Sequence, residues 1–270
     1  MRKPRFSRFH FNLSIVVASA AWLFAATAPA VAQRAPWERM EAAAKLLDGA
    51  APKTDAIRLD LPAVTQDGSA VPLTVVIDHP MSADHYIESL HLFASGNPSP
   101  EVAEFSFSPL AGEARLSTRI RLDGTQNVIA LARTNRGEWL AGAREVRVTV
   151  SGCLTQAGAF DGDDFMRTRV RAPNRLRRGE AAEIRTLINH PMETGLRKDA
   201  DGQAVPERIL TEFRARVAGQ PVIHAKFHRA VAANPYLLFH VAPGQAGTLD
   251  LEWTEDTGKT ATATAEIPAA

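Results

Sequence analysis

Cys153 is the single cysteine of this 270-residue chain and its strongest candidate for covalent chemistry. It lies in the run Val150-Ser151-Gly152-Cys153-Leu154-Thr155, directly after a β-rich segment. One thiol cannot form an intramolecular disulfide, so the residue is either packed as a small apolar side chain or used as a working group. The second interpretation makes Cys153 a nucleophile or attachment point on a loop, where Gly152 gives the arm flexibility. The residues alone leave both interpretations open.

Histidines recur in two similar turns. Asp78-His79-Pro80-Met81 in the first half of the chain matches Asn189-His190-Pro191-Met192 in the second. Histidine and methionine can be metal ligands, but a duplicated structural corner gives the same pattern, because proline ends a strand and methionine packs beneath it. His224 and His228 are four residues apart and fall on one face of a strand, without a third ligand near them in sequence. We therefore expect no metal site.

Motifs of the common enzyme classes are absent from the sequence. There is no Gly-x-Ser-x-Gly elbow, no glycine-rich phosphate loop and no paired-cysteine motif for metal or haem. A thiol enzyme would need a histidine within hydrogen-bond reach of Cys153, and nothing in the sequence places one there. Five arginines on expected strands could attract an anion or lower the pKa of a nearby thiol, but a solvated sheet face explains them more simply. These are Arg144, Arg147, Arg167, Arg169 and Arg171. We expect no catalytic residues, no cofactor and no enzyme activity.

Residues 1–32 have the composition of a secretory signal. A basic segment precedes a mainly apolar stretch, residues 13–28, and Ala30-Val31-Ala32 fits a cleavage site. The apolar stretch is short for a membrane span, so we expect an exported protein without membrane contact after cleavage. Loss of four basic residues and no acidic one would leave 27 Lys+Arg against 30 Asp+Glu, which changes the formal charge from +1 to −3. That balance gives no reason to expect nucleic acid as a partner.

Beyond residue 33 the hydrophobic pattern predicts one helix and then only strands. The helix opens at Pro36 and ends before Gly49, a natural C-cap. Its apolar residues recur at helical spacing: Trp37, Met40, Ala44 and Leu47. The later segments alternate with a period of two between Gly, Pro, Asn and Asp clusters. The predicted strands are residues 73–78, 87–93, 103–107, 114–122, 127–134, 143–150, 165–170, 182–188, 209–217, 222–227, 236–241, 247–254 and 260–267.

The two histidine turns lie 111 residues apart. This spacing indicates duplication of one sandwich, because solenoid repeats are shorter. We expect an all-β fold with two immunoglobulin-like β-sandwich domains in tandem and a short N-terminal helix. The expected boundaries are 1–32 for the signal peptide, 33–150 for the first sandwich with its helix, 151–164 for a linker that carries Cys153, and 165–270 for the second sandwich.

The second half of the chain resembles SoxZ, a sulfur-oxidation subunit. The segments that carry this resemblance are 186–199, with its His-Pro-Met-Glu-Thr-Gly run, 232–237 and 253–258. The first half is similar to SoxY in its N-terminal helix, its sandwich and its closing Arg147-Val148-Thr149-Val150-Ser151-Gly152-Cys153 run. Together the halves resemble the fused SoxYZ-like carriers found alongside quinoprotein dehydrogenases, with a SoxY-like domain over 33–150 and a SoxZ-like domain over 165–270.

The resemblance implies a non-catalytic carrier. In the family, the arm cysteine of SoxY holds the sulfur substrate covalently and presents it to separate periplasmic enzymes, while SoxZ is the scaffold that pairs with it. Cys153 is the position that takes this role here. The family's cysteine lies between glycines at a free C-terminus, whereas Cys153 is internal and is followed by Leu154 and Thr155. The arm is therefore expected to be stiffer, and to enter a partner as a hairpin.

Two functions follow from these observations. The first is a periplasmic carrier that holds a sulfur-containing intermediate on Cys153 and presents it to periplasmic oxidoreductases, either Sox-type enzymes or a quinoprotein dehydrogenase. The alternative is a non-covalent accessory or interaction module for such a dehydrogenase, in which Cys153 is incidental. The sequence does not identify the cargo or the enzymes that load and unload it.

Overall fold

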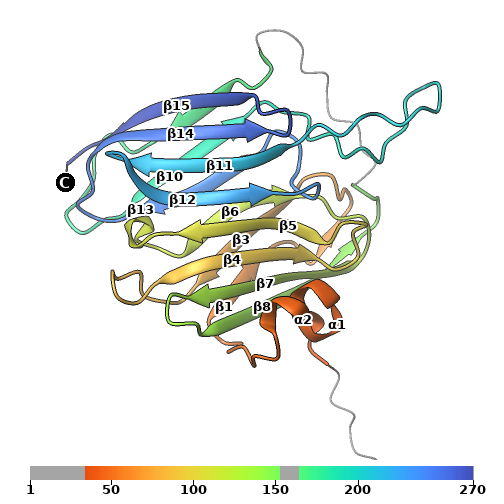
Figure 1. The fold of residues 1–270 in the computed structure, drawn as a ribbon, viewed down its shortest axis with the longest axis horizontal. Helices are drawn as coiled ribbons and strands as arrows, with labels where there is room; N and C mark the ends of the chain where they lie inside the picture. Colours follow the sequence, from red (N-terminus) through yellow and green to blue (C-terminus); the bar gives the residue numbers. More distant parts are fainter. Residues whose placement is uncertain (1–33, 153–163, 270) are drawn as a thin grey trace, which may run out of the picture. The chain divides into compact units, whose positions relative to one another are not determined.

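The structure is a computed structural model that describes residues 34–152 and 164–269. In these residues the chain forms β-strands and three short helical segments (Figure 1). The predicted all-β class with a short N-terminal helical region is confirmed. None of the helices in the described ranges has the length and apolar character that a membrane crossing requires.

The described residues of the first half contribute eight strands. Their bounds are β1 (Ile57–Asp60), β2 (Val64–Thr65), β3 (Val71–Ile77), β4 (Ile87–Ala94), β5 (Glu101–Phe107), β6 (Arg115–Ile120), β7 (Gln126–Thr134) and β8 (Trp139–Val148). A 3-10 turn, η1 (Pro109–Ala111), separates β5 from β6. β1 and β2 were not predicted, because β1 has only two apolar residues among four and β2 is two residues long.

The second half contributes the other seven strands of the described residues. Their bounds are β9 (Thr168–Arg171), β10 (Ala182–Ile188), β11 (Leu210–Val217), β12 (Gln220–Phe227), β13 (Tyr236–Val241), β14 (Gly247–Glu255) and β15 (Thr260–Ile267). The clean alternation that predicted β14 is visible in its burial, because Leu249, Leu251 and Trp253 point into the core.

Two short helices replace the single predicted helix. α1 covers Pro36–Arg39 and α2 covers Glu41–Leu47, and Met40 between them has an extended backbone. α2 ends at Asp48, which adopts the left-handed conformation (φ 46°) and donates its backbone N–H to the Ala44 carbonyl. The apolar side of the helices covers the outer face of β4, β7 and β8. The buried residues of this small cluster are Met40, Ala43, Leu47, Phe93, Ile129, Leu131 and Ala141.

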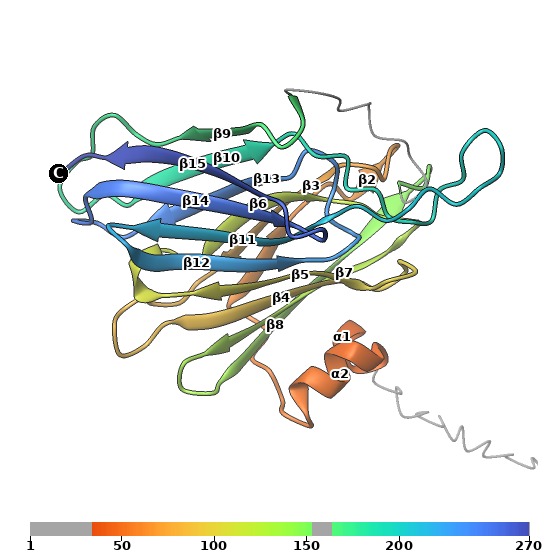
Figure 2. The same ribbon diagram turned by 45° about the horizontal axis from the view of Figure 1, so that its top comes forward.

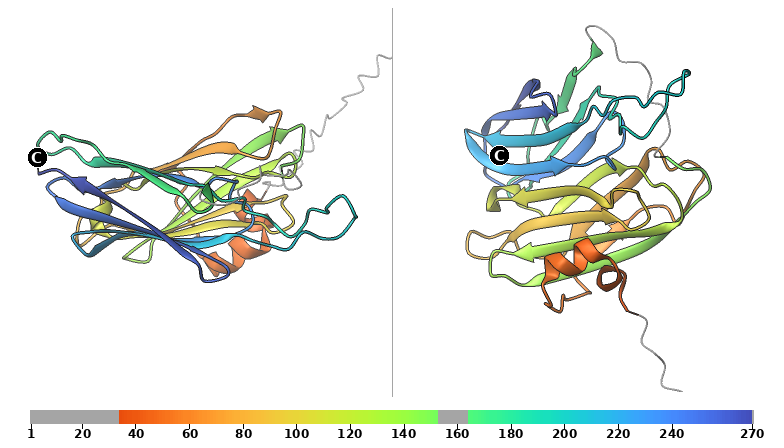
Figure 3. Two further views of the ribbon diagram at one scale, coloured as in Figure 1. Left: turned by 90° about the horizontal axis from the view of Figure 1, so that it is seen from above. Right: turned by 45° about the vertical axis from the view of Figure 1, so that its right-hand side comes forward.

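Two sheets face each other, and each runs through both halves of the chain (Figures 2 and 3). The strand order is β1-β3-β6-β13-β10-β9 in one sheet and β15-β14-β11-β12-β5-β4-β7-β8-β2 in the other. The pairing is antiparallel except between β2 and β8. The two predicted sandwiches therefore lie edge to edge and share their sheets, which no local sequence pattern indicated.

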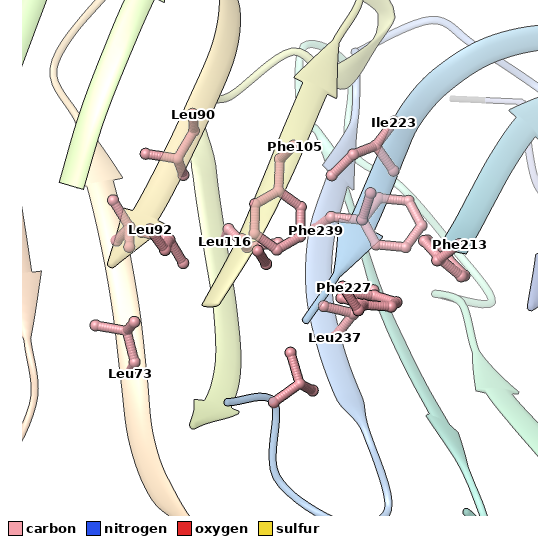
Figure 4. Packing of buried hydrophobic residues seen from close by; sticks show 14 of the residues in the cluster. Leu73, Leu90, Leu92, Phe105, Leu116, Phe213, Ile223, Phe227, Leu237 and Phe239 are labelled. Carbon is pink, nitrogen blue, oxygen red and sulfur yellow. The ribbon is translucent and has the colours of Figure 1, made fainter. Parts of the chain in front are cut away.

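The junction between the halves is made by one strand pair in each sheet. β12 pairs with β5 from Ile223–Phe107 to Phe227–Ala103, and β13 meets β6 at Leu238–Ser117. Between the sheets, side chains from both halves fill one continuous core (Figure 4). Phe105 of the first half packs edge-on against Phe227 of the second, with ring centroids 6.4 Å apart. The halves are thus joined by backbone hydrogen bonds and by burial of apolar surface.

Arg121 fixes the junction from inside. It follows β6 in the first half and is only 3% exposed. Its Nη1 donates to the carbonyl oxygens of Met192 (2.6 Å) and Val231 (3.2 Å), and its Nη2 donates to that of Pro191 (3.2 Å). These acceptors all belong to the second half. A buried guanidinium is tolerated here because carbonyl oxygens accept its N–H groups.

Replacing Arg121 should therefore weaken the whole described unit. Arg121→Leu keeps most of the side-chain volume but leaves buried carbonyl groups without donors, so we expect the free energy of unfolding to fall by about 2–5 kcal/mol. Arg115→Leu, at an exposed position of β6, is the matched control and should change it by less than about 0.5 kcal/mol. Denaturant unfolding measures both. Equal stability of the two variants would contradict the bridging role of Arg121.

Candidate functional site

Cys153 lies outside the described residues, as does the rest of segment 153–163. The structure does describe the residues that precede it. Val150, Ser151 and Gly152, called the arm base below, follow the end of β8 and lead to the cysteine. The candidate site is therefore built from the arm base and from the segments that hold it.

Backbone hydrogen bonds tie the arm base to two other segments. The Gly152 N–H donates to the Leu122 carbonyl (3.0 Å), and the Gly68 N–H donates to the Val150 carbonyl (3.0 Å). The triangle is closed by the Leu122 N–H, which donates to the Gly68 carbonyl (2.8 Å). Because each segment contacts the other two, the chain is held in place up to the residue before the cysteine.

Side chains reinforce this attachment. The Ser151 hydroxyl donates to the Asp123 carboxylate. Two residues earlier, the Thr149 hydroxyl donates to the Gln66 carbonyl (3.3 Å). The arm base is thus anchored by polar contacts on both sides, although Ser151 is only partly buried.

Gly152 has a steric reason to be glycine. It is buried, and a Cβ built on it would lie 2.0 Å from the carbonyl carbon of Gly68 and 2.3 Å from the backbone nitrogen of Ser69. Gly68 is under the same constraint, because a Cβ there would lie 2.1 Å from the Leu122 carbonyl oxygen. These two glycines allow two backbone segments to approach each other closely. The flexibility assigned to Gly152 from the sequence stays a prediction.

A projecting hairpin of the second half starts next to the arm base. Leu122, which accepts the bond from Gly152, directly follows Arg121, and Arg121 binds the carbonyls of Pro191 and Met192. From there residues 193–208 form a hairpin, closed by the mutual backbone hydrogen bonds of Glu193 and Arg208 (2.9 Å each). It projects on the side where β8 ends (Figures 1 and 2). Both halves therefore contribute to this end of the structure.

The histidine turn of the second half is a buried structural corner, as predicted. His190 is fully buried, and its Nδ1 accepts from the Met192 N–H (3.1 Å). Its Nε2 must then carry the proton, and it donates to Glu255 Oε1 (3.0 Å). The Met192 sulfur accepts from the Leu210 N–H (3.2 Å). The carboxylate of Glu255 also accepts from Arg208 Nε (2.7 Å), so a cation completes the group.

Two further effects set the charge states at this corner. Burial lowers the pKa of His190, although its hydrogen bond to Glu255 opposes the shift. Burial alone would raise the pKa of Glu255, but hydrogen bonds from Thr257, His190 and Arg208 outweigh it and hold that pKa below its ordinary value. The corner therefore holds a neutral histidine, a carboxylate and a guanidinium at neutral pH.

The histidine turn of the first half gathers residues that sequence reasoning missed. His79 lies with His85 and Glu138, and one ligand atom from each falls within 4.8 Å of the others. The Met81 sulfur accepts from the Ile87 N–H (3.4 Å), which repeats the arrangement of Met192. No sequence signal pointed to Glu138, because it is 53 residues beyond His85 and lies in the turn before β8.

The other predicted positions do not form a site with these histidines. His224 faces Glu212 (3.7 Å), and His228 faces Glu104 (3.8 Å), so each has its own carboxylate. The five arginines considered for anion binding are all exposed. Arg167 pairs with Asp164 (2.8 Å), and Arg144 donates to the Leu59 carbonyl (3.2 Å).

The arm base and the His79 group lie at opposite ends of the same strands. Gly68 precedes β3 and His79 follows it, while Glu138 precedes β8 and Gly152 follows it. β3 alone spans about 20 Å at the usual rise per residue. The two groups are thus separate sites.

Two families match the chain in the order that the fold shows. The family described as sulfur oxidation protein SoxY matches residues 43–153, and the family described as sulphur oxidation protein SoxZ matches residues 170–266. The chain is a SoxYZ-like fusion protein. No curated protein matches its sequence.

Solved structures resemble parts of this SoxYZ-like protein. The sulfur carrier protein SoxY from Chlorobium limicola f thiosulfatophilum is 26% identical with a TM-score of 0.33, over 40% of this chain and 94% of that chain. The superoxide reductase (neelaredoxin) from Ignicoccus hospitalis is 16% identical with a TM-score of 0.33, over 36% of this chain and 94% of that chain. The superoxide reductase from Nanoarchaeum equitans is 17% identical with a TM-score of 0.31, over 36% of this chain and 100% of that chain.

The close approach at the arm base makes Gly152→Ala a direct test of this geometry. The added methyl group would meet the Gly68 backbone, which cannot rotate away, so we expect the free energy of unfolding to fall by about 1–3 kcal/mol. Gly124→Ala is the matched control, because a Cβ at Gly124 has no atom within 4 Å. Thermal or denaturant unfolding compares the two. If both variants were as stable as the wild type, the arm base would not be held as described.

The corner at His190 predicts how stability depends on pH. Because the folded-state pKa of His190 is lowered, the unfolded chain binds a proton near pH 6.5 that the folded chain binds only at lower pH. Stability is therefore fully present above about pH 7 and falls as the pH decreases through 6.5. Glu255 adds a further loss below its ordinary pKa of about 4.3–4.5, because its folded-state pKa is also lowered.

Unfolding measured from pH 8 to pH 4 checks this linkage. We expect the curve of His190→Gln to be flatter than that of the wild type between pH 7 and pH 5. A residual slope should remain, because burial also lowers the pKa of His91 and of His240. Parallel curves for the two proteins would exclude His190 as a source of the acid sensitivity.

Proposed function

We propose that this SoxYZ-like protein is a periplasmic carrier that holds a sulfur-containing intermediate covalently on Cys153 and presents it to partner enzymes. One observation carries the proposal: the SoxY match extends through residue 153 and ends on the cysteine itself. In the SoxY family this region carries the arm cysteine. The SoxZ half supplies the scaffold beside the arm.

The chemistry requires a thiolate and a partner that donates sulfur. In one loading reaction, the Cys153 thiolate attacks the outer sulfur of a persulfide on the partner, a new S–S bond forms, and the partner's thiolate leaves. This exchange needs no oxidant. Loading as a thiosulfonate instead joins the thiol to thiosulfate with loss of one proton and two electrons, which an oxidoreductase partner must accept. No other residue of the chain offers a thiol for either reaction.

The arm base determines where a cargo would be presented. Cys153 is bonded to Gly152, so its Cα lies about 3.8 Å from a residue that the body holds firmly. The chain returns to the body at Asp164. A partner must therefore accept a tethered loop close to the body, and the hairpin 193–208 of the SoxZ half lies at the same end. This arrangement favours a partner that contacts both halves.

The partners that fit this proposal are periplasmic oxidoreductases. The two matching families favour Sox-type enzymes, while the resemblance to fused carriers favours a quinoprotein dehydrogenase. Periplasmic location rests on residues 1–32, whose basic, apolar and small-residue segments have the order of a secretory signal.

The carrier proposal is tested on protein purified from its native periplasm. Mass spectrometry should detect Cys153 carrying added sulfur or a sulfonate-bearing group under sulfur-oxidising conditions, and treatment with a dithiol should remove it. A Cys153→Ser strain should lose the adduct completely and with it carrier-dependent oxidation. Ser151→Ala keeps the thiol and is the matched control for a change in the arm. An unmodified thiol in every condition, together with a wild-type phenotype of Cys153→Ser, would reject the carrier function.

An accessory module is the second candidate. It is favoured by an open groove of about 620 Å³ on the six-stranded sheet, lined by Leu61, Thr74 and Arg119 of the SoxY half and by Tyr236 of the SoxZ half. Thr74→Arg would fill this groove. Loss of dehydrogenase binding in Thr74→Arg, with normal function of Cys153→Ser, would support the accessory module over the carrier.

A further inference from the structure

The group formed by His79, His85 and Glu138 has the composition of a metal site. Nε2 of His79 and Nε2 of His85 are 3.1 Å apart, and the rings meet edge-on at 83°. Nε2 of His85 is 3.8 Å from Glu138 Oε2. Two imidazoles and a carboxylate are a ligand set that zinc and related divalent ions bind.

The hydrogen bonds around His79 leave its Nε2 free of a proton. Its Nδ1 lies 2.7 Å from the Pro80 carbonyl oxygen, which can only accept, so Nδ1 carries the hydrogen of the neutral ring. A backbone carbonyl bound in this way is the usual outer partner of a metal-ligating histidine. The lone pair of Nε2 then points toward His85, whose own Nε2 faces it at close range.

Lys53 orients the carboxylate of Glu138 with one oxygen toward the two histidines. Lys53 Nζ donates to its Oε1 (2.9 Å), which leaves Oε2 toward the histidines. The hydrogen bond from Lys53 and the charge of that residue keep the pKa of Glu138 below its ordinary value. Its side chain is 43% exposed and that of His85 is 26% exposed, so an ion can reach the group from solvent.

The loops that carry these residues are fixed to each other. Asn135, in the turn before Glu138, donates to the Asp84 carbonyl (3.1 Å) and accepts from the Tyr86 N–H (3.0 Å). Arg136 binds the Asp84 carboxylate (3.2 Å). The segment that contains His85 and the turn that contains Glu138 are therefore held together without a metal, which lowers the cost of ordering the site.

The duplicated corner of the SoxZ half shows what the first half lacks. There His190 and Glu255 are completed by the guanidinium of Arg208. In the SoxY half the fixed cation is Lys53, which lies against Oε1 of Glu138. On the Oε2 side lies His85, and this second imidazole brings no fixed positive charge to that side. A bound cation would supply that charge.

We propose that His79, His85 and Glu138 bind a divalent transition-metal ion of the zinc type. Tetrahedral ligands at 2.0–2.1 Å from zinc lie about 3.3 Å from one another, so the two imidazole nitrogens need to move by only a few tenths of an ångström. Three protein ligands leave a fourth position for water or an anion. His79 also lines an open cavity of about 420 Å³, which gives an exogenous ligand access. The site is independent of Cys153, which follows the opposite end of β8.

Titration of Zn²⁺ into the purified protein tests the proposal. The protein carries Cys153→Ala, so that the thiol cannot bind the ion and the outcome does not depend on the carrier function. Calorimetry should give one Zn²⁺ per chain at this site, and Co²⁺ in its place should give the intense visible absorption of a tetrahedral complex. Absence of saturable binding, or a Co²⁺ spectrum without these bands, would overturn the proposal.

Three variants make the test specific to this group. His85→Arg reproduces the arrangement of the SoxZ corner and should lower the Zn²⁺ affinity by more than the roughly 10- to 100-fold that loss of an outer partner costs. Glu138→Gln, at an exposed position, should lower it without a change in fold. His228→Gln removes a histidine elsewhere and should leave it unchanged. Zinc affinity that survives His85→Arg, or that is lost in His228→Gln, would place the ion elsewhere and reject the site.

Discussion

Backbone pairing across both sheets at once is the constraint on which this structure depends. A single shared sheet could twist or hinge at its junction, but β5–β12 and β6–β13 pair in opposite layers, with one core between them. Arg121 adds a buried guanidinium whose acceptors lie in the other half. Without the SoxZ half, β5 and β6 would become open edges beside exposed apolar side chains. The fusion is therefore one body and not two independent sandwiches on a linker.

The arm base is attached to the segment that joins the two halves. Gly152 bonds to Leu122, and Leu122 follows the arginine that holds the two halves together. The attachment of the arm and the junction of the halves thus share one short segment. The hairpin 193–208 is connected to the same segment, because Arg121 donates to the carbonyls of Pro191 and Met192 directly before it. In the proposed carrier function, this segment would couple the arm to the SoxZ half.

Local patterns in the sequence predicted most of the strands but not how the two halves meet. β10, β13 and β15 were predicted with the bounds that the structure shows. Burial alternates along β10 and β15, whereas β13 is a short and mostly apolar run; turn residues flank each of them. β8 begins at Trp139, four residues before the predicted start at residue 143. The prediction began too late because Leu140-Ala141-Gly142 shows no alternation of apolar and polar residues. The pairing of β5 with β12 joins residues more than a hundred positions apart, so no local period indicates it. For the same reason His79 could be singled out from its turn, while its partner Glu138 could not.

The two histidine corners show how one duplicated motif can reach two electrostatic solutions. Both place an imidazole against a carboxylate beneath a strand end. In the SoxZ half the pair is buried, and an isolated carboxylate there would be costly, so Arg208 is required as a permanent counter-charge. In the SoxY half the group is partly exposed, solvent screens the carboxylate, and Lys53 approaches it from the outer side only. The inner side is then occupied by two facing imidazole nitrogens, which share at most one proton when both rings are neutral. Either a proton or a metal ion can lie between the two nitrogens, but only a metal ion can bind both nitrogens and the carboxylate at once.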